Sequence, residues 1–198
     1  MASVTAVDEC IGRVVKAVES SPEKDNTIIV VTSDHGWNMG EKGWLFKNSL
    51  WEESCRVPMI IVAPGYAKGK VVKKPVSLVD VFPTLVDLCG MEKPAVVKGA
   101  VELSGSSMRP LMKDGPSDDW EGSGYAISVV RGDGATVLDH HWTIRSSRWR
   151  YIRYANGKEE LYDHVRDPGE WMNLAEKKEF KGEKEKMRAA LYKELGVE

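Results

Sequence analysis

The side chains with the clearest potential for chemistry are Asp34 and His35, which follow the apolar, β-branched run 27–31 after two further residues. Carboxylate oxygens and imidazole nitrogens bind divalent cations, and Gly36 frees the backbone to turn just after them. A buried run of this kind predicts a strand of a parallel sheet, where ligands bind beyond the carboxyl ends of the strands. The pattern therefore predicts a metal site, and its alternative is a helix N-cap aspartate beside a surface histidine.

A long segment rich in Trp and Gly separates this pair from the next apolar run. It extends through Trp51 and carries Glu41 and Lys47. Loops longer than about 12 to 15 residues in compact domains usually bind something or are disordered. We therefore expect this loop to be functional.

The flanking sequence predicts the elements that position the loop. A helix precedes the first strand, and a second strand is expected over residues 59–63. The apolar residues of that helix fall on one face, at Val4, Val7, Ile11, Val14, Val15 and Val18. This order of helix, strand, loop and strand is typical of an open α/β sheet.

A further helix is expected after Asp80, whose carboxylate is placed to cap it. Its first turn accommodates Pro83, and Gly90 suits a left-handed terminator. From about Lys113 to Gly124 the composition turns to Gly, Pro, Ser and Asp. We place a boundary there, between a first domain over 1–115 and a second over 116–198.

The second domain is predicted to be a small antiparallel sheet with a packing helix. Strand-like alternation occurs over 125–130, 136–144 and 149–154, and the hairpin signal Ala155-Asn156-Gly157-Lys158 follows. Residues 179–195 show helical spacing of apolar side chains among many Lys and Glu.

Composition excludes some classes of function. The 198 residues, 42% of them hydrophobic, suffice for a core of one ordinary domain or one and a half, and a net charge of -2 argues against nucleic acid as a partner. We interpret the basic run 145–154 as a strand with basic residues on its solvent face. No apolar run approaches the roughly 20 residues of a membrane span, and no signal-peptide pattern precedes the first helix.

Three cysteines provide neither a disulfide framework nor a zinc signature. Cys10 and Cys89 are interpreted as small apolar residues of helices. Cys55 lies next to Arg56, which would favour its thiolate, but structural burial is the preferred interpretation.

Several motifs, in order along the chain, resemble those of the sulfatases. The segments are T-S-D-H-G at 32–36, G-E-K at 40–42, W-E-E-S-C-R-V-P at 51–58, V-D-E-C-I-G-R-V at 7–14, the 79–90 helix, and stretches within 148–175. The resemblance implies an α/β fold with part of an alkaline-phosphatase-like sheet, flanking helices and the small C-terminal antiparallel sheet. It also implies hydrolysis of sulfate esters in the intact enzyme.

The resemblance assigns roles to individual residues. Asp34 and His35 would bind one divalent cation, Ca²⁺, with the aspartate as the main ligand. Lys47 would be catalytic and substrate-binding, neutralising a sulfate oxygen and stabilising charge on the leaving oxygen, whereas its alternative is an ordinary surface lysine. His140 and His141 would border the substrate cleft, with a structural role as the alternative.

The resemblance also implies roles in shaping the loop. Glu41 and Lys42 would order it and Arg56 would anchor it. Asn38 and Trp44 stand where related patterns have histidine, which leaves the identity of the substrate open.

Two parts of the family's site do not occur in these residues. The formylglycine motif C/S-x-P-S-R is not encoded, and no Asp-Asp pair ends an early strand. We therefore expect a C-terminal portion with half a site, which would associate with a missing N-terminal half or with itself. The expected ligand is a sulfated small molecule or carbohydrate, and the alternatives are a phosphoesterase of the same superfamily or a non-catalytic module. The compartment is left open, since sulfatases are often periplasmic, secreted or lysosomal.

Overall fold

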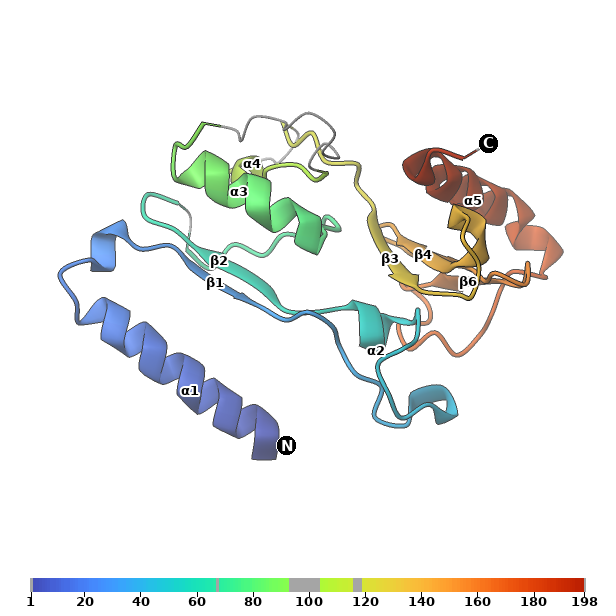
Figure 1. Ribbon diagram of the computed structural model, residues 1–198, viewed down its shortest axis with the longest axis horizontal. Coiled ribbons are helices and arrows are strands. Elements are labelled where there is room, and N and C mark those ends of the chain that lie inside the picture. The colour runs from blue at the N-terminus through green and yellow to red at the C-terminus, as the bar shows by residue number, and fades with distance from the viewer. Residues whose placement is uncertain (1, 67, 93–103, 116–118, 198) are drawn as a thin grey trace.

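The computed structural model describes residues 2–66, 68–92, 104–115 and 119–197 (Figure 1). Its helices are α1 (Ala2–Glu19), α2 (Glu52–Cys55), α3 (Val81–Leu88), α4 (Arg109–Met112) and α5 (Lys181–Leu195). Its strands are β1 (Ile29–Thr32), β2 (Met59–Val62), β3 (Ala126–Val130), β4 (His141–Arg145), β5 (Trp149–Arg153) and β6 (Glu159–Asp163). The strands form a two-stranded sheet, β1-β2, and a four-stranded sheet in the order β3-β4-β5-β6.

The predicted strands are present as β1 and β2, but they pair antiparallel, whereas β1 was expected to belong to a parallel sheet. Ile29 lies opposite Val62 and Thr32 lies opposite Met59. The 33–51 loop and α2 reverse the chain, so that β2 returns along β1. A β-branched apolar run is typical of strands in parallel sheets, but the direction of a neighbouring strand also depends on the segment that connects the two.

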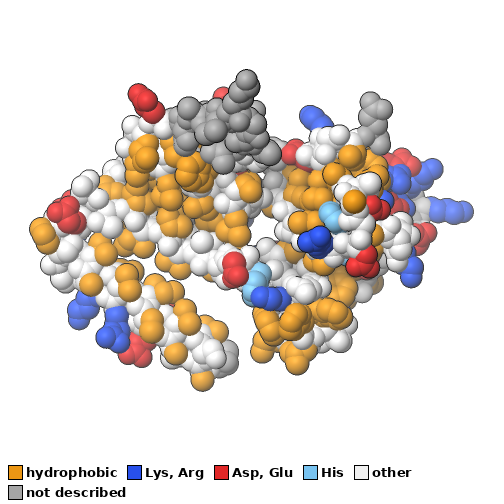
Figure 2. All heavy atoms as spheres, viewed as in Figure 1, with side chains coloured by type: hydrophobic (Ala, Val, Ile, Leu, Met, Phe, Trp, Pro, Cys, Tyr) orange, Lys and Arg blue, Asp and Glu red, His pale blue; other side chains and the backbone are white. Residues whose placement is uncertain are grey.

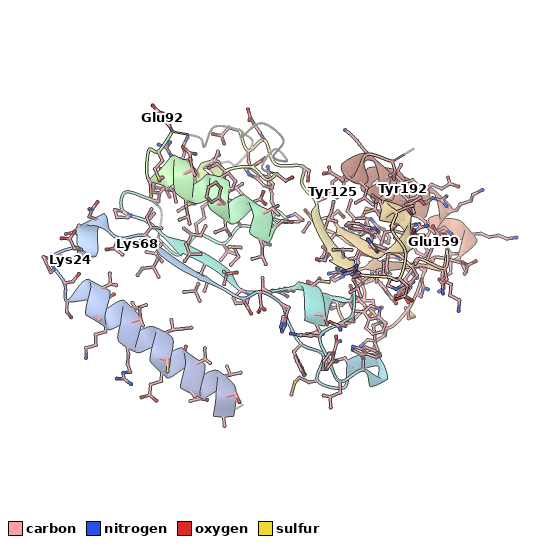
Figure 3. The ribbon with its side chains drawn as sticks, viewed as in Figure 1. Lys24, Lys68, Glu92, Tyr125, Glu159 and Tyr192 are labelled. Carbon is pink, nitrogen blue, oxygen red and sulfur yellow. The ribbon has the colours of Figure 1, made fainter. Side chains whose placement is uncertain are left out.

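The predicted first helix is present as α1, but it buries none of its residues. Val4, Val7 and Val14 are 69%, 57% and 63% exposed. In Figure 3 the side chains of α1 extend into open space, in contrast to those around Glu159 and Tyr192. The strand β1 is likewise only half-buried, so the first part of the chain presents apolar surface to solvent.

Asp80 does not cap α3, contrary to the sequence prediction. Its carboxylate accepts hydrogen bonds from the backbone N–H of Ser77 (2.8 Å) and of Ser106 (2.8 Å), so it joins two separate segments. The Thr84 hydroxyl donates to the Asp80 carbonyl (2.5 Å) and accepts from the Met108 N–H (2.8 Å). The expected left-handed terminator is confirmed, with Gly90 at a φ of +61°.

The four-stranded sheet with its packing helix confirms the predicted antiparallel subdomain. The expected strand over 136–144 begins only at His141, because Val137–Asp139 form a 3₁₀ turn held by a capping box. Helix α5 places Met187 and Leu191 in the core, which is completed by Ile144, Tyr151, Leu161, Leu174 and Ala175. This is the most thoroughly buried part of the described chain.

The interpretation of 145–154 as a strand with a basic solvent face was wrong at Arg150, which is 2% exposed. Its guanidinium reaches back to the Leu50 carbonyl (3.2 Å), across the proposed domain boundary. The division at 115/116 itself remains a prediction. Among the described residues, no helix is long and apolar enough to cross a membrane.

All three cysteines are free in the structure. Cys10 lies in α1 and Cys89 at the end of α3, as predicted, and both are exposed. Cys55 is half-buried, and burial raises the pKa of its thiol even though Arg150 favours the thiolate. A raised pKa fits the structural interpretation of Cys55.

Candidate metal and anion site

Asp34, His35 and Lys47 come together at the end of β1. The Nε2 atom of His35 lies 3.5 Å from Oδ2 of Asp34 and 2.9 Å from Nζ of Lys47. The Asp34 side chain is 85% exposed and that of His35 is 35% exposed. The loop thus joins an aspartate, an imidazole and an ammonium in one open cluster.

The hydrogen bonds of His35 define which ring nitrogen carries the proton. An ammonium can only donate, so Nε2 of His35 must accept from Lys47. The proton then lies on Nδ1, which donates to the Gly36 carbonyl at 2.7 Å. A backbone carbonyl bound to one ring nitrogen is the arrangement that presents the other nitrogen's lone pair to a metal.

The Asp34 carboxylate is held in its charged form. Desolvation raises its pKa, but the His35 ring, the backbone N–H groups of Asp34 and His35, and Lys47 together lower the pKa below the ordinary value. The His35 N–H donates to Oδ1 at 3.1 Å. The carboxylate is therefore fixed beside the imidazole while Oδ2 remains turned toward Nε2.

These residues fit a divalent cation. Oδ2 of Asp34 and Nε2 of His35 are 3.5 Å apart, close enough for both to contact one ion. Calcium binds oxygen ligands at about 2.3–2.6 Å and uses carboxylates in particular. The ammonium of Lys47 lies 2.9 Å from Nε2 of His35, the ring nitrogen that would bind the cation.

Buried polar contacts hold the 33–51 loop in shape. The backbone N–H of Asn38 donates to the Phe46 carbonyl (3.0 Å), and that of Gly40 donates to the Trp44 carbonyl (3.1 Å). The side-chain oxygen of the fully buried Asn38 accepts from the hydroxyls of Ser49 (2.8 Å) and Ser54 (2.6 Å). The two arms of the loop are therefore tied together between His35 and Lys47.

Gly36 is required where the loop meets α2. Its N–H donates to the Ser54 carbonyl at 2.9 Å. A Cβ atom at this position would lie 2.0 Å from the Glu53 carbonyl oxygen and 3.0 Å from that of Arg56. The glycine of the predicted metal motif thus serves close backbone packing.

The G-E-K motif orders the loop, as the resemblance implied. Glu41 accepts from the Met39 N–H at 2.5 Å. The Lys42 ammonium lies 5.0 Å from the Trp51 ring centroid and 4.5 Å from that of Tyr162, and it donates to the Glu170 carbonyl. Desolvation lowers the pKa of Lys42 more than nearby carboxylates raise it.

Arg150 is the residue that the sequence reasoning missed. Its Nε donates to Glu170 at 2.5 Å, its Nη2 donates to Glu52, and its Nη1 donates to Thr143 (3.1 Å) as well as to Leu50. A basic residue flanked by the core residues of β5 was the available signal. It joins the end of the 33–51 loop and the start of α2 to the C-terminal sheet.

A second group of possible metal ligands lies around this arginine. Side-chain ligand atoms of Glu52, His164 and Glu170 all lie within 4.8 Å of one another. Arg150 pairs with both carboxylates, and Arg145 lies 3.4 Å from Glu52. We interpret the group as a buried ion-pair cluster, because two guanidinium groups already neutralise its carboxylates.

His140 and His141 are each held by a hydrogen bond from a backbone N–H group. Nδ1 of His140 accepts from the Gly132 N–H (3.2 Å), and Nδ1 of His141 accepts from the Ala155 N–H (3.0 Å). Neither belongs to the large groove that contains the cluster; its other walls include Arg56, Arg145 and strand β3. Their roles in substrate binding, and an anchoring role of Arg56, remain predictions.

Comparison with known proteins identifies the family. Residues 40–196 match the family described as N-sulphoglucosamine sulphohydrolase, C-terminal. The chain is 36% identical to a sulfatase of Formosa agariphila over 98% of its own length and 35% of that protein's. It is also 36% identical to an N-acetylglucosamine-6-O-sulfatase of Bacteroides thetaiotaomicron, over 95% of this chain and 34% of that one.

Solved structures agree with the sequence matches. A protein in complex with its substrate D-glucosamine-2-N,6-O-disulfate superimposes with a TM-score of 0.81 at 33% identity, over 96% of this chain and 38% of the other. A phosphonate monoester hydrolase from Silicibacter pomeroyi gives 0.78 at 26% identity, over 95% and 38%.

The fold therefore has the mixed α/β, alkaline-phosphatase-like architecture of these structural neighbours. The chain belongs to the sulfatase family and corresponds to its C-terminal region. It spans about a third of the length of the curated relatives that it matches. Sulfatases use a divalent metal together with formylglycine.

Proposed function

We propose that this chain supplies the cation-binding and sulfate-binding part of a sulfate ester hydrolase. The observation that carries the proposal is the convergence of Asp34, His35 and Lys47, with Nε2 of His35 2.9 Å from the Lys47 ammonium and 3.5 Å from the Asp34 carboxylate. The family membership of the chain supports the same reaction class.

Asp34 and His35 would hold the cation, which we propose to be Ca²⁺. Nε2 of His35 has a single lone pair, now directed at Lys47. If Asp34 and His35 held a cation, the Lys47 ammonium would be free to donate to a sulfate oxygen. Binding of the cation would therefore also make Lys47 available to bind sulfate.

Lys47 would then act on the charge of the reacting group. In phosphoryl transfer, and by analogy in sulfuryl transfer, positioning and electrostatic stabilisation supply most of the catalysis. Formylglycine supplies the nucleophile in the family, and none of the present residues encodes its motif. The contribution of this chain is to bind and orient the sulfate group and to stabilise its negative charge.

The proposed substrate is a sulfated carbohydrate. The relatives include an N-acetylglucosamine-6-O-sulfatase, and a structural neighbour binds a disulfated glucosamine. Phosphonate or phosphate ester hydrolysis is the second candidate, because phosphonate monoester hydrolases have the same fold.

We also propose that the exposed apolar surface of the first part of the chain is covered by further protein, either an N-terminal sulfatase portion or a second copy. Val4, Val7 and Val14 of α1 are exposed, and so are Ile60 and Val62 of β2, at 54% and 48%. The matched relatives are about three times as long as this chain. Exposed strand edges and apolar faces favour such association.

A chimera tests the function without assuming that this chain is active alone. The corresponding C-terminal third of the Formosa agariphila sulfatase is replaced by this chain, and hydrolysis of an aryl sulfate and an aryl phosphonate is compared. We expect sulfate hydrolysis that falls at least about 100-fold in Asp34→Ala and in Lys47→Ala. Preference for the phosphonate would select the second candidate, and full sulfate activity in both variants would contradict the assignment.

A further inference from the structure

The 33–51 loop carries an exposed apolar patch beside the proposed sulfate site. Its aromatic members are Trp37, Trp44 and Phe46, which are 42%, 41% and 44% exposed, and Met39 and Leu45 extend it. Figure 2 shows hydrophobic side chains gathered over this loop, next to a histidine and a basic side chain. An apolar patch of this kind on a soluble domain often marks a binding surface.

The loop holds the aromatic rings in fixed positions. The rings of Trp37 and Phe46 pack together with centroids 5.3 Å apart and planes at 56°. The backbone bond between Asn38 and Phe46 and that between Gly40 and Trp44 connect the two arms of the loop. Rings that are already ordered lose little conformational entropy when a ligand covers them.

The patch is continuous along the chain with the charged cluster. Phe46 directly precedes Lys47, and Trp37 follows His35 by two residues. A sulfate held by Lys47 would therefore bring the rest of its ester to the edge of the aromatic rings. Consecutive Cα atoms lie about 3.8 Å apart, which is within the size of one sugar ring.

The chemistry of the surface matches a sulfated sugar. A pyranose ring offers a face of C–H groups to aromatic rings, while its hydroxyl groups stay in water and its sulfate pairs with an ammonium. A lipid bilayer would instead require the 85% exposed Asp34 side chain to approach an apolar phase. A sulfated sugar can therefore contact the aromatic rings with its C–H groups and the Lys47 ammonium with its sulfate.

We propose that Trp37, Trp44 and Phe46 form a carbohydrate subsite that binds the pyranose ring of the sulfated substrate. The proposal rests on the function assigned above, since it uses the sulfate at Lys47 as the fixed point. It adds the residues that would distinguish a sugar sulfate from a bare sulfate ion.

The test compares three probes by NMR titration of the full chain: inorganic sulfate, D-glucosamine 6-sulfate, and unsulfated N-acetylglucosamine. We expect the sulfated sugar to bind more tightly than inorganic sulfate. Trp44→Ala and Phe46→Ala should each weaken the sulfated sugar about five- to tenfold and leave inorganic sulfate within about twofold. Phe82→Ala is the matched control, because Phe82 is 49% exposed and belongs to α3, which lies apart from the 33–51 loop in Figure 1.

The outcomes separate the two proposals. Lys47→Ala should weaken both sulfate-bearing probes, and failure of that variant to weaken either would contradict the proposed function itself. Equal affinity for sulfate and sulfated sugar, or unchanged sugar affinity in both aromatic variants, would overturn the subsite alone. If the aromatic variants lost affinity equally for inorganic sulfate and for the sulfated sugar, the subsite would also be overturned, since the rings would then affect binding only through Lys47. No binding of any sulfate-bearing probe would count against both proposals.

Discussion

Lys47 Nζ lies 2.9 Å from His35 Nε2, across 12 residues of intervening loop. The ammonium therefore occupies the one lone pair of His35 that can bind a metal ion. This relationship would couple the two halves of the proposed site, because Lys47 would be available to an anion when His35 and Asp34 held a cation.

Replacing Gly36 by alanine should destabilise the fold, because the new Cβ would lie 2.0 Å from the Glu53 carbonyl oxygen. Overpacking of this kind typically costs about 1–3 kcal/mol. Urea unfolding measures the loss. Gly12→Ala in α1 is the control: its Cβ would meet nothing within 4 Å, so the unfolding free energy should not fall. Equal stability of the two variants would show that Gly36 is not tightly packed.

Arg150→Met should lower the unfolding free energy by about 3–5 kcal/mol, since it leaves two carboxylates, Glu52 and Glu170, partly uncompensated in a buried place. Arg166→Met provides the matched control. Arg166 is 72% exposed and lies 3.8 Å from Asp163, so its loss should cost less than about 0.5 kcal/mol. A similar loss of unfolding free energy in both variants would show that the buried ion pairs of Arg150 contribute no more to stability than an exposed one.

Two lysines of the same loop should behave differently. Lys42 packs on Trp51 and Tyr162, and Lys42→Met should cost about 1–2 kcal/mol of stability. Lys47→Met should leave stability within about 0.5 kcal/mol while abolishing sulfate binding. Thermal unfolding and sulfate titration of both variants check this division, which reversed effects would refute.

Stability should decline on acidification because the pKa values of Glu52 and Glu170 are lowered in the folded state. Burial by itself raises both pKa values. For Glu52 the charge of Arg150 is the largest of the effects that together outweigh burial. For Glu170 the hydrogen bond from His164 and the charge of Arg150 are the largest of the effects that outweigh it. A depressed folded pKa gives stability that is present above the unfolded value of 4.5 and is lost as pH falls through the folded pKa. Unfolding free energy should therefore decrease below about pH 4.5.

The variant that isolates this effect is Glu170→Gln, whose stability should depend less steeply on acidic pH. The exposed Glu176 offers the comparison, and Glu176→Gln should keep the slope of the parent chain. An unchanged slope in Glu170→Gln would show that this carboxylate contributes nothing to acid sensitivity.

The sequence predicted local elements well because their signals are local. The spacing of apolar residues in α1 and α5, the hairpin signal at 155–158 and the turn at Gly90 each act within a few residues. The antiparallel pairing of β1 with β2 and the burial of Arg150 depend on segments far apart in the chain. Periodicity reports which positions are apolar but not which partner covers them.

The candidate site was predictable only in part for the same reason. Asp34 and His35 adjoin a strand end, so their proximity follows from the sequence. The contact with Lys47 depends on how Asn38, Ser49 and Ser54 fold the loop, which no spacing rule describes.

A calcium titration followed through the ring nitrogens of His35 by NMR tests the central claim most directly. We predict that Ca²⁺ shifts the Nε2 signal of His35 with a dissociation constant near the millimolar range, because a site with few protein ligands binds calcium weakly. Asp34→Asn should remove this response. The signals of His164, which pairs with Glu170 at 2.7 Å, should stay unchanged. A His35 signal that does not respond to Ca²⁺, or that responds equally in Asp34→Asn, would contradict a cation site at Asp34 and His35.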